Sequence, residues 1–112
     1  MASVDDLWLV DLGEPHPGEP GSFRPALVIG PPDTFGPEFP FAIVTPLTST
    51  HRALSLHVEV EATEHTGLEV TSYVQCELIR SINRKRLVHR LGHVDADTSA
   101  RVSEIIRTLL NH

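Results

Sequence analysis

The sequence is poor in the features that several protein classes require. It contains a single cysteine, Cys76, which excludes an internal disulfide and a zinc site built on paired cysteines. No apolar run approaches the roughly 18 residues that a membrane-spanning helix needs. The first residues lack the basic start and the apolar stretch of a signal peptide. We therefore expect a cytoplasmic protein that makes no contact with a membrane.

Sequence motifs of the large enzyme classes are also absent. There is no glycine-rich loop ahead of a helix to cradle phosphate, and no serine at a nucleophile elbow. Seven histidines suggest a metal site, and His89 and His93 would share one face of an extended strand. Four positions of a strand span roughly 13 Å, however, which is too far for two ligands of one ion. The sequence therefore predicts neither a metal nor another cofactor.

Charge is unevenly distributed along the chain. The formal net charge of −6 disfavours a protein that is basic all over, whereas affinity for a phosphate backbone comes from basic side chains. Acidic residues crowd the N-terminal stretch and residues 59–69. Residues 80–90 hold a basic cluster, which consists of Arg80, Arg84, Lys85, Arg86 and Arg90. The cluster fits either a local surface for nucleic acid or a solvated basic loop.

Short apolar runs between glycine- and proline-rich turns predict a protein made mainly of β-strands. In residues 57–61 apolar and polar side chains alternate, which is typical of a strand with one buried face. The same alternation in residues 72–79 places Tyr73, Gln75 and Glu77 on a polar face. In all, the pattern predicts strands at residues 7–10, 25–29, 41–44, 57–61, 72–79 and 87–94.

The end of the sequence predicts a helix, with Asp95 or Asp97 as its N-cap. Five or six short strands and one terminal helix fit a small, strongly curved sheet or partial barrel, with the helix packed over an opening. We expect an α+β fold, mainly β, that spans residues 1–112 as a single domain. The apolar stripe of the expected helix is formed by Val102, Ile105, Ile106, Leu109 and Leu110.

Five short strings occur in the order and spacing of a known family. They are LWLVDL at residues 7–12, RPALVI at 24–29, IVTPLTST at 43–50, CELIRSI at 76–82 and LGHV at 91–94. Together with the helix that follows, they resemble the MazF/PemK/Kid family of toxin endoribonucleases over nearly the whole chain. The resemblance implies a small SH3-like partial β-barrel of the CcdB/Kid/PemK type with a C-terminal amphipathic helix.

The resemblance also implies an activity and partners. Members of this family are toxins of type II toxin–antitoxin systems that cleave single-stranded RNA at short sequences, which inhibits translation and growth. They need no metal, because a ribose 2′-hydroxyl attacks the adjacent phosphate. The implied partners are a second copy of the chain, in a homodimer, and a cognate antitoxin. The antitoxin would lay an acidic segment over the RNA-binding surface.

This chemistry needs a base for the hydroxyl proton and a cation for the charge on the phosphate oxygens. Arg24 matches the family's catalytic arginine, and its forked, permanently charged guanidinium fits phosphate. Thr48 matches the functional threonine, whose hydroxyl can donate to phosphate or orient the attacking group. Glu77 occupies the acidic position that the Kid branch is thought to use as a base. Simpler explanations are a surface arginine beside Pro25, a turn threonine, and a structural pair of Glu77 with Arg80.

Residues in and beside the loops are expected to bind RNA. Phe23 can stack on an unpaired base, although a core position fits it equally well. Two positions depart from relatives: Kid-like members have an arginine where this chain has Gln75, and the histidine of their first loop corresponds to Gly18, with His16 two residues earlier. The group that completes proton transfer is therefore left open. The expected RNA contacts are Phe23, Ser49, Arg52, His57, Gln75 and Arg80.

Two other functions are compatible with the same fold. CcdB-like relatives share it and act as toxins that bind and poison a DNA topoisomerase, without need for Arg24 and Thr48. A barrel-like module that binds peptides is a third alternative. The presence of both Arg24 and Thr48 favours the endoribonuclease.

Overall fold

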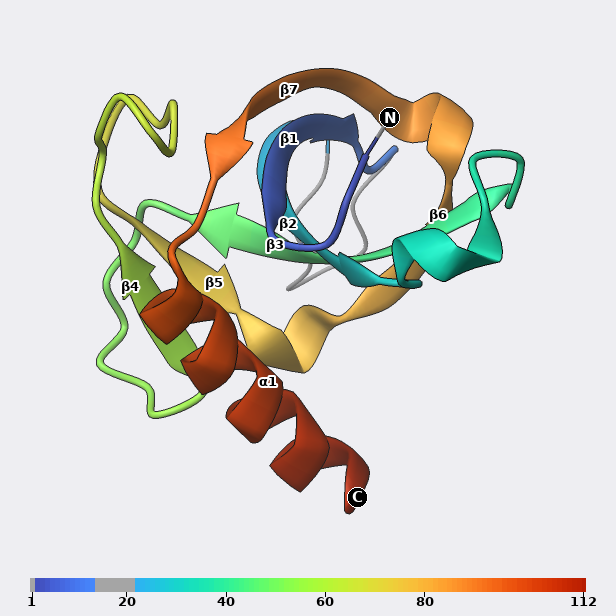
Figure 1. Ribbon diagram of the computed structural model, residues 1–112. Helices are drawn as coiled ribbons and strands as arrows, with labels where there is room; N and C mark the ends of the chain where they lie inside the picture. The colour runs from blue at the N-terminus through green and yellow to red at the C-terminus, as the bar shows by residue number, and fades with distance from the viewer. Residues whose placement is uncertain (1, 14–21) are drawn as a thin grey trace.

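The computed structural model describes residues 2–13 and 22–112. It is a strongly curved antiparallel sheet with one helix lying across it (Figure 1). The order of strands is β4-β5-β3-β2-β1-β7, and β6 pairs with β3 beside this path. The strands of the described residues form an open sheet and not a closed barrel, so the expected mainly-β partial barrel is confirmed. The strands are β1 (Asp6–Asp11), β2 (Phe23–Gly30), β3 (Phe41–Thr48), β4 (His57–Val60), β5 (Ser72–Gln75), β6 (Arg80–Asn83) and β7 (Leu87–His93). Helix α1 (Ala96–Leu110) follows β7, and three 3₁₀ turns are η1 (Asp33–Phe35), η2 (Cys76–Leu78) and η3 (Arg84–Arg86).

Strand β3 is longer than the sequence indicated, because it continues through Pro46 to Thr48. Its first half pairs with β6 and its end pairs with β5, while β2 lies along its other side. Pro46, which has no N–H to donate, occupies the point where β3 changes partner. The sheet bends away from a flat layer at this place.

The expected strand at residues 72–79 is wrong in its second half. Leu47 opposes Val74, so an unbroken strand would bring Glu77 opposite Val44, but Val44 opposes Arg80 instead. Three residues are therefore extra, and they form the turn η2. An alternating pattern cannot reveal such an insertion, because it depends on the pairing of two strands far apart in sequence. As a result, Glu77 projects from a turn rather than from the face of a strand.

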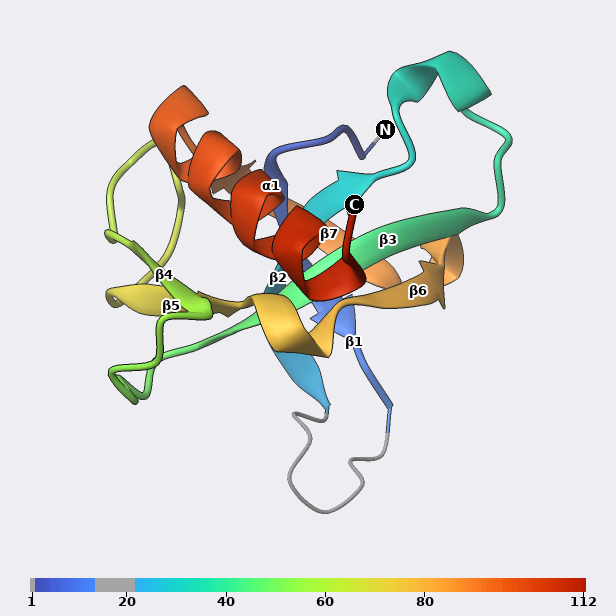
Figure 2. The same cartoon turned by 90° about the horizontal axis from the view of Figure 1, so that it is seen from below.

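Apolar residues form one core on each face of the sheet. The inner core fills the curve of the sheet and includes Val10, Val28 and Val44. The outer core lies under α1, where Val102 packs with residues such as Leu27 and Leu47. Figure 2 shows α1 lying across the strands. The same strands thus contribute side chains to two cores, one on each face. The ends of the strands and the loops are left to form a functional site.

Helix α1 begins as predicted. The carboxylate of Asp95 accepts a 2.8 Å hydrogen bond from the backbone N–H of Thr98, so Asp95 is the N-cap. This bond favours the charged carboxylate and lowers the pKa of Asp95. At the other end, Leu109 and Leu110 are 42% and 53% exposed. Within residues 2–13 and 22–112, no helix is long and apolar enough to cross a membrane.

Two glycines join the loop between β4 and β5 to strand β7. A Cβ at Gly92 would collide with the carbonyl oxygen of His65, and a Cβ at Gly67, whose φ is +69°, would collide with the carbonyl oxygen of Leu91. The N–H of His93 also donates a 2.9 Å hydrogen bond to the carbonyl of His65. The two backbones are therefore in direct contact, and the loop is held against β7.

Replacement of Gly92 by alanine should break this contact. We expect Gly92→Ala to lower the free energy of unfolding by ~1–3 kcal/mol, because the backbones must separate to admit a methyl group. Urea denaturation followed by circular dichroism measures the change. Gly30→Ala is the control, since its new Cβ would meet the Ile43 side chain at an ordinary 3.5 Å. Equal losses in the two variants would contradict the role of the contact.

Candidate active site

Arg24 is the second residue of β2 and lies beside the end of β3. On its other side it pairs with Val10 of β1. Ala26 opposes Pro46, and continuing this register by two residues brings Arg24 opposite Thr48. Opposed residues of antiparallel strands have Cβ atoms roughly 5 Å apart on the same face. The register therefore brings a guanidinium and a hydroxyl together where β2 begins and β3 ends.

Thr48 ends β3 with its side chain buried, at 7% exposure. Its Oγ1 accepts a 3.2 Å hydrogen bond from the backbone N–H of Thr50. The hydroxyl thus holds the turn, which is the simpler role weighed for it, and its own proton is still available for donation. Ser49, the next residue, is exposed.

Strand β5 continues this face with an aromatic pair. Tyr73 opposes Thr48, and its ring stacks on that of His51 with centroids 4.9 Å apart and an angle of 17° between the planes. His51 lies in the exposed loop between β3 and β4. A flat pair of rings is a platform for an unpaired base. No feature of the sequence indicated His51, and only the polar face of its strand pointed to Tyr73.

His57, Gln75 and Glu77 form a polar group next to this pair. His57 begins β4 and opposes Gln75, the last residue of β5. Nε2 of His57 lies 2.9 Å from Oε2 of Glu77, and the side chains are 3% and 30% exposed. The simpler explanation of Glu77, a pair with Arg80, is therefore not the one observed. Gln75 is only 8% exposed, so neither His57 nor Gln75 presents its side chain to solvent, and their contact with RNA stays a prediction.

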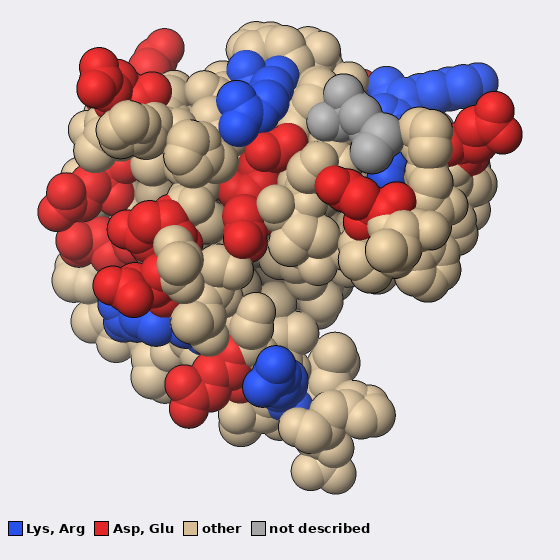
Figure 3. Space-filling view, viewed as in Figure 1, with Lys and Arg blue, Asp and Glu red and all other residues tan. Residues whose placement is uncertain are grey.

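Two arginines of the basic cluster of residues 80–90 are held by partners within the protein. Nε of Arg84 donates a 2.7 Å hydrogen bond to the carbonyl of Phe39, and Arg90 pairs with Asp6 at 3.2 Å. Both side chains therefore tie strands and loops together. On the face seen in Figure 3, acidic side chains separate the Lys and Arg residues, so they form no continuous basic surface there.

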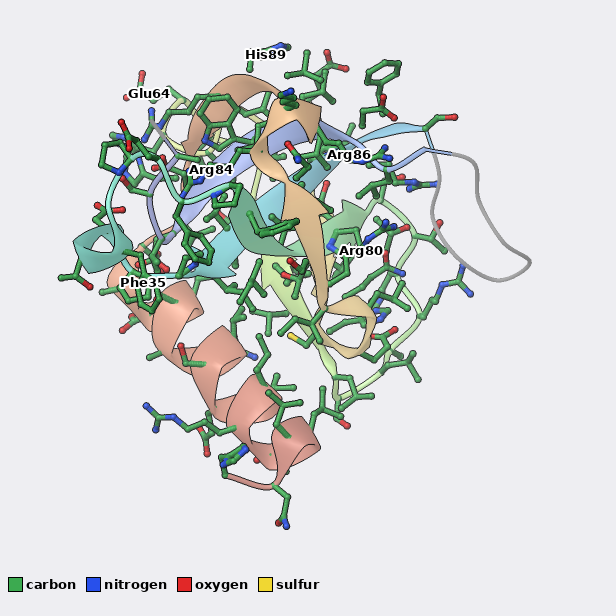
Figure 4. The ribbon with its side chains drawn as sticks, turned by 90° about the vertical axis from the view of Figure 1, so that its right-hand side faces the viewer. Phe35, Glu64, Arg80, Arg84, Arg86 and His89 are labelled. Atoms are coloured by element: carbon green, nitrogen blue, oxygen red, sulfur yellow. The ribbon has the colours of Figure 1, made fainter. Side chains whose placement is uncertain are left out.

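Other basic residues flank the site. Arg80 begins β6 with an exposed side chain, and Arg86 is exposed beside the end of β1, where Nη1 donates a 3.3 Å hydrogen bond to the carbonyl of Asp11. Figure 4 shows both on one side of the sheet. Arg52 is exposed in the loop after β3. These cations are spaced around the site rather than gathered within it.

A groove of about 500 Å³ opens beside Arg24. Phe23, which is 61% exposed, and Ser49 line it together with Arg24. Most of the lining is apolar, and Glu69 and His89 are its other titratable members. The sequence indicated His89 only as a metal ligand, because its position in this groove depends on the pairing of β7 with β1, where His89 opposes Leu9.

Two residues named from the sequence cannot be placed, and two histidines considered as metal ligands lie apart. Gly18 and His16 lie outside the described residues. His89 and His93 line different hollows of the surface. In residues 2–13 and 22–112, no three His, Cys, Asp or Glu side chains gather in a group that could hold a metal ion.

Comparison with known proteins identifies the family. A family model described as "PemK-like, MazF-like toxin of type II toxin-antitoxin system" matches residues 4–110. The chain belongs to this family.

Individual relatives are similar to this toxin over almost their full length. Endoribonuclease EndoA of Bacillus subtilis (strain 168) is 33% identical over 108 residues, which cover 94% of the toxin and 90% of EndoA. MazF (Form-I) from Deinococcus radiodurans matches with a TM-score of 0.85 at 24% identity, over 99% and 97% of the two chains. For the Mycobacterium tuberculosis toxin MazF-mt6 the TM-score is 0.78 at 24% identity, over 95% and 96%. The predicted family and fold are confirmed, and EndoA supports the predicted enzyme class.

Cys76 of the toxin precedes Glu77 but belongs to the outer core, with 0% exposure. Burial, together with the negative charge of Glu77, raises the pKa of the Cys76 thiol from 9.0 to about 11. The thiol is therefore protonated at neutral pH and is not a nucleophile.

The Cys76 thiol of the folded toxin should react slowly with Ellman's reagent at pH 8. A thiol with a pKa near 11 has only about one thiolate per thousand molecules at that pH, and the core also covers it. Urea should restore a fast reaction. The unfolded chain loses this proton at lower pH than the folded one, so the stability that Cys76 contributes should be complete below pH 9 and fall toward pH 11. Equal reaction rates with and without urea would contradict the burial.

Proposed function

We propose that the chain is a sequence-selective endoribonuclease toxin that cleaves single-stranded RNA without a metal. The observation that carries the proposal is the register of β2 and β3, which, continued two residues beyond the pair of Ala26 and Pro46, brings Arg24 opposite Thr48. A guanidinium can bind both non-bridging oxygens of a phosphodiester at once, and a neighbouring hydroxyl can donate a further hydrogen bond to one of them. The 33% identity with an endoribonuclease supports the same activity.

The proposed reaction uses a nucleophile that the RNA itself supplies. Glu77 accepts the proton of the ribose 2′-hydroxyl, and O2′ forms a bond to phosphorus. Arg24, with Thr48, stabilises the charge that develops on the phosphate oxygens. The bond from phosphorus to O5′ then breaks, leaving a 2′,3′-cyclic phosphate and a 5′-hydroxyl. The O5′ oxygen takes up a proton from water as it leaves.

Bases on either side of the cut would bind to exposed aromatic and polar groups. Phe23 stands in the groove with an open ring face, and the pair of Tyr73 and His51 forms a second platform. Ser49 can donate to RNA from the groove wall, while Arg52 and Arg80 can contact phosphates at a distance from the cut. The spacing of the two platforms would select among short sequences.

Two protein partners belong to the proposal. One structure with a TM-score of 0.79 is an endoribonuclease in complex with its cognate antitoxin from Mycobacterial species, and another is MazE-MazF (Form-II) from Deinococcus radiodurans, with a TM-score of 0.78. We infer a cognate antitoxin that covers the Arg24 groove with an acidic segment. We also infer a homodimer, for which the exposed Leu109 and Leu110 offer apolar surface. The RNA substrate puts the activity in the cytoplasm.

Arg24→Ala should reduce RNA cleavage at least ~100-fold, because nothing else replaces the charge at phosphorus. The assay incubates the purified toxin with a long single-stranded RNA in EDTA and sequences the ends, where a 2′,3′-cyclic phosphate is expected. Arg101→Ala is the matched control, since it removes an exposed arginine of α1 that lines a different hollow. Circular dichroism and gel filtration check that both variants fold and assemble alike.

Three outcomes would contradict the proposal. Cleavage that survives the loss of Arg24 would remove its assigned role. Strict dependence on a metal would indicate a different mechanism. Absence of any cleavage, combined with inhibition of a DNA topoisomerase, would favour the CcdB-like alternative.

A further inference from the structure

Buried polar atoms without partners point to an interaction behind Glu77. In the described part of the chain, four buried side-chain atoms have no hydrogen-bond partner: Trp8 Nε1, Thr45 Oγ1, His57 Nδ1 and Gln75 Oε1. The last two belong to residues that oppose each other on β4 and β5. Leaving such an atom unpaired destabilises the folded state, because its bond to water is lost and not replaced. Two unpaired atoms on opposed residues therefore point to one interaction that would satisfy both.

The contact with Glu77 determines which ring nitrogen of His57 carries a proton. Because a carboxylate only accepts hydrogen bonds, Nε2 must carry a proton and donate it across the 2.9 Å to Oε2. In a neutral imidazole ring, Nδ1 is then an acceptor. It lies in the interior and needs a donor.

Gln75 can supply that donor. Its amide carries two N–H groups on one side and an oxygen on the other, and a half-turn about the last side-chain bond exchanges them. Because Oε1 of Gln75 is buried, the interior holds two hydrogen-bond acceptors side by side, this oxygen and Nδ1 of His57. A half-turn puts an N–H in the buried position and moves the oxygen to the other side of the amide. The two groups are not hydrogen-bonded in the structure. Opposed Cβ atoms are roughly 5 Å apart, so a change of the Gln75 rotamer brings the amide to the ring.

We propose that Gln75 and His57 are positioning residues for Glu77, joined by hydrogen bonds from the Gln75 amide to His57 Nδ1 and from His57 Nε2 to Glu77. Glu77 stands on the short turn η2 with its side chain 30% exposed, so little else in its own element restrains the carboxylate. His57 holds one carboxylate oxygen and leaves the other free for the ribose hydroxyl. The inference rests on the proposed function, because it takes Glu77 as the base.

Kinetics of Gln75→Leu tests the positioning role. We expect kcat for RNA cleavage to fall ~10- to 100-fold with KM unchanged, because the base is misplaced while RNA binding is intact. The same substitution made in a Glu77→Gln protein should have no further effect, since the group that it positions is already gone. Thr45→Val is the matched control. It removes another buried, unpaired polar atom, from the face of β3 that does not carry Thr48, and should leave kcat unchanged.

The protonation of His57 can be measured without any cleavage. ¹⁵N spectra of the imidazole groups, assigned with His57→Gln, should show a proton on Nε2 and a hydrogen-bonded Nδ1 without one. Gln75→Leu should shift the Nδ1 resonance of His57 to that of an unpaired acceptor, and Thr45→Val should not. If the wild-type protein cuts no RNA, the proposed function fails, but this spectrum still tests the hydrogen bonds.

Other results would overturn the inference. A proton on Nδ1 of His57 would show that Gln75 does not donate to it. A rise in KM at constant kcat in Gln75→Leu would indicate direct contact with RNA. Equal losses of kcat with and without Glu77 would indicate that Gln75 acts on the fold alone.

Discussion

Pairing of β3 on both of its edges is the constraint on which the rest of the structure depends. β2 covers one edge, while β6 and then β5 cover the other. Because side chains alternate along a strand, Val44 enters the inner core and Leu47 enters the outer one. The strand ends at Thr48, so the same pairing that builds both cores puts this hydroxyl beside Arg24. Burial of β3 therefore determines the site as well as the fold.

Strands with a plain pattern could be predicted from the sequence, and a strand with an insertion could not. Residues 7–10 and 25–29 form strands because apolar runs there are bounded by polar or turn-forming residues. Residues 72–79 show the same alternation, yet three residues leave the ladder at Cys76. Only the pairing of β3 with both β5 and β6 reveals the mismatch. The N-cap of α1, by contrast, is local chemistry and was accessible from Asp95 and the apolar stripe.

The residues of the candidate site likewise fall into those that the sequence could predict and those that it could not. Arg24 and Thr48 could be named from short strings, and the register brings them together. His57 and Gln75 were expected at the surface, because polarity in a sequence usually indicates exposure. Their burial follows from the β4–β5 pairing. Likewise, Arg84 is occupied by the carbonyl of Phe39, 45 residues away in sequence, so a basic cluster counted along the chain overstates the free positive charge.

The close approach of the loop at Gly67 to strand β7 at Gly92 gives the groove a property that side chains alone could not. One wall of the groove continues from Gly67 through Leu68, Glu69 and Val70, and main chain pressed on main chain fixes where that wall begins. The outline of the groove is thus independent of which side chains cover it. In evolutionary terms, substitutions at the exposed positions 69 and 70 can alter the surface offered to RNA or to a protein partner without disturbing the core, whereas a side chain at either glycine forces the two backbones apart.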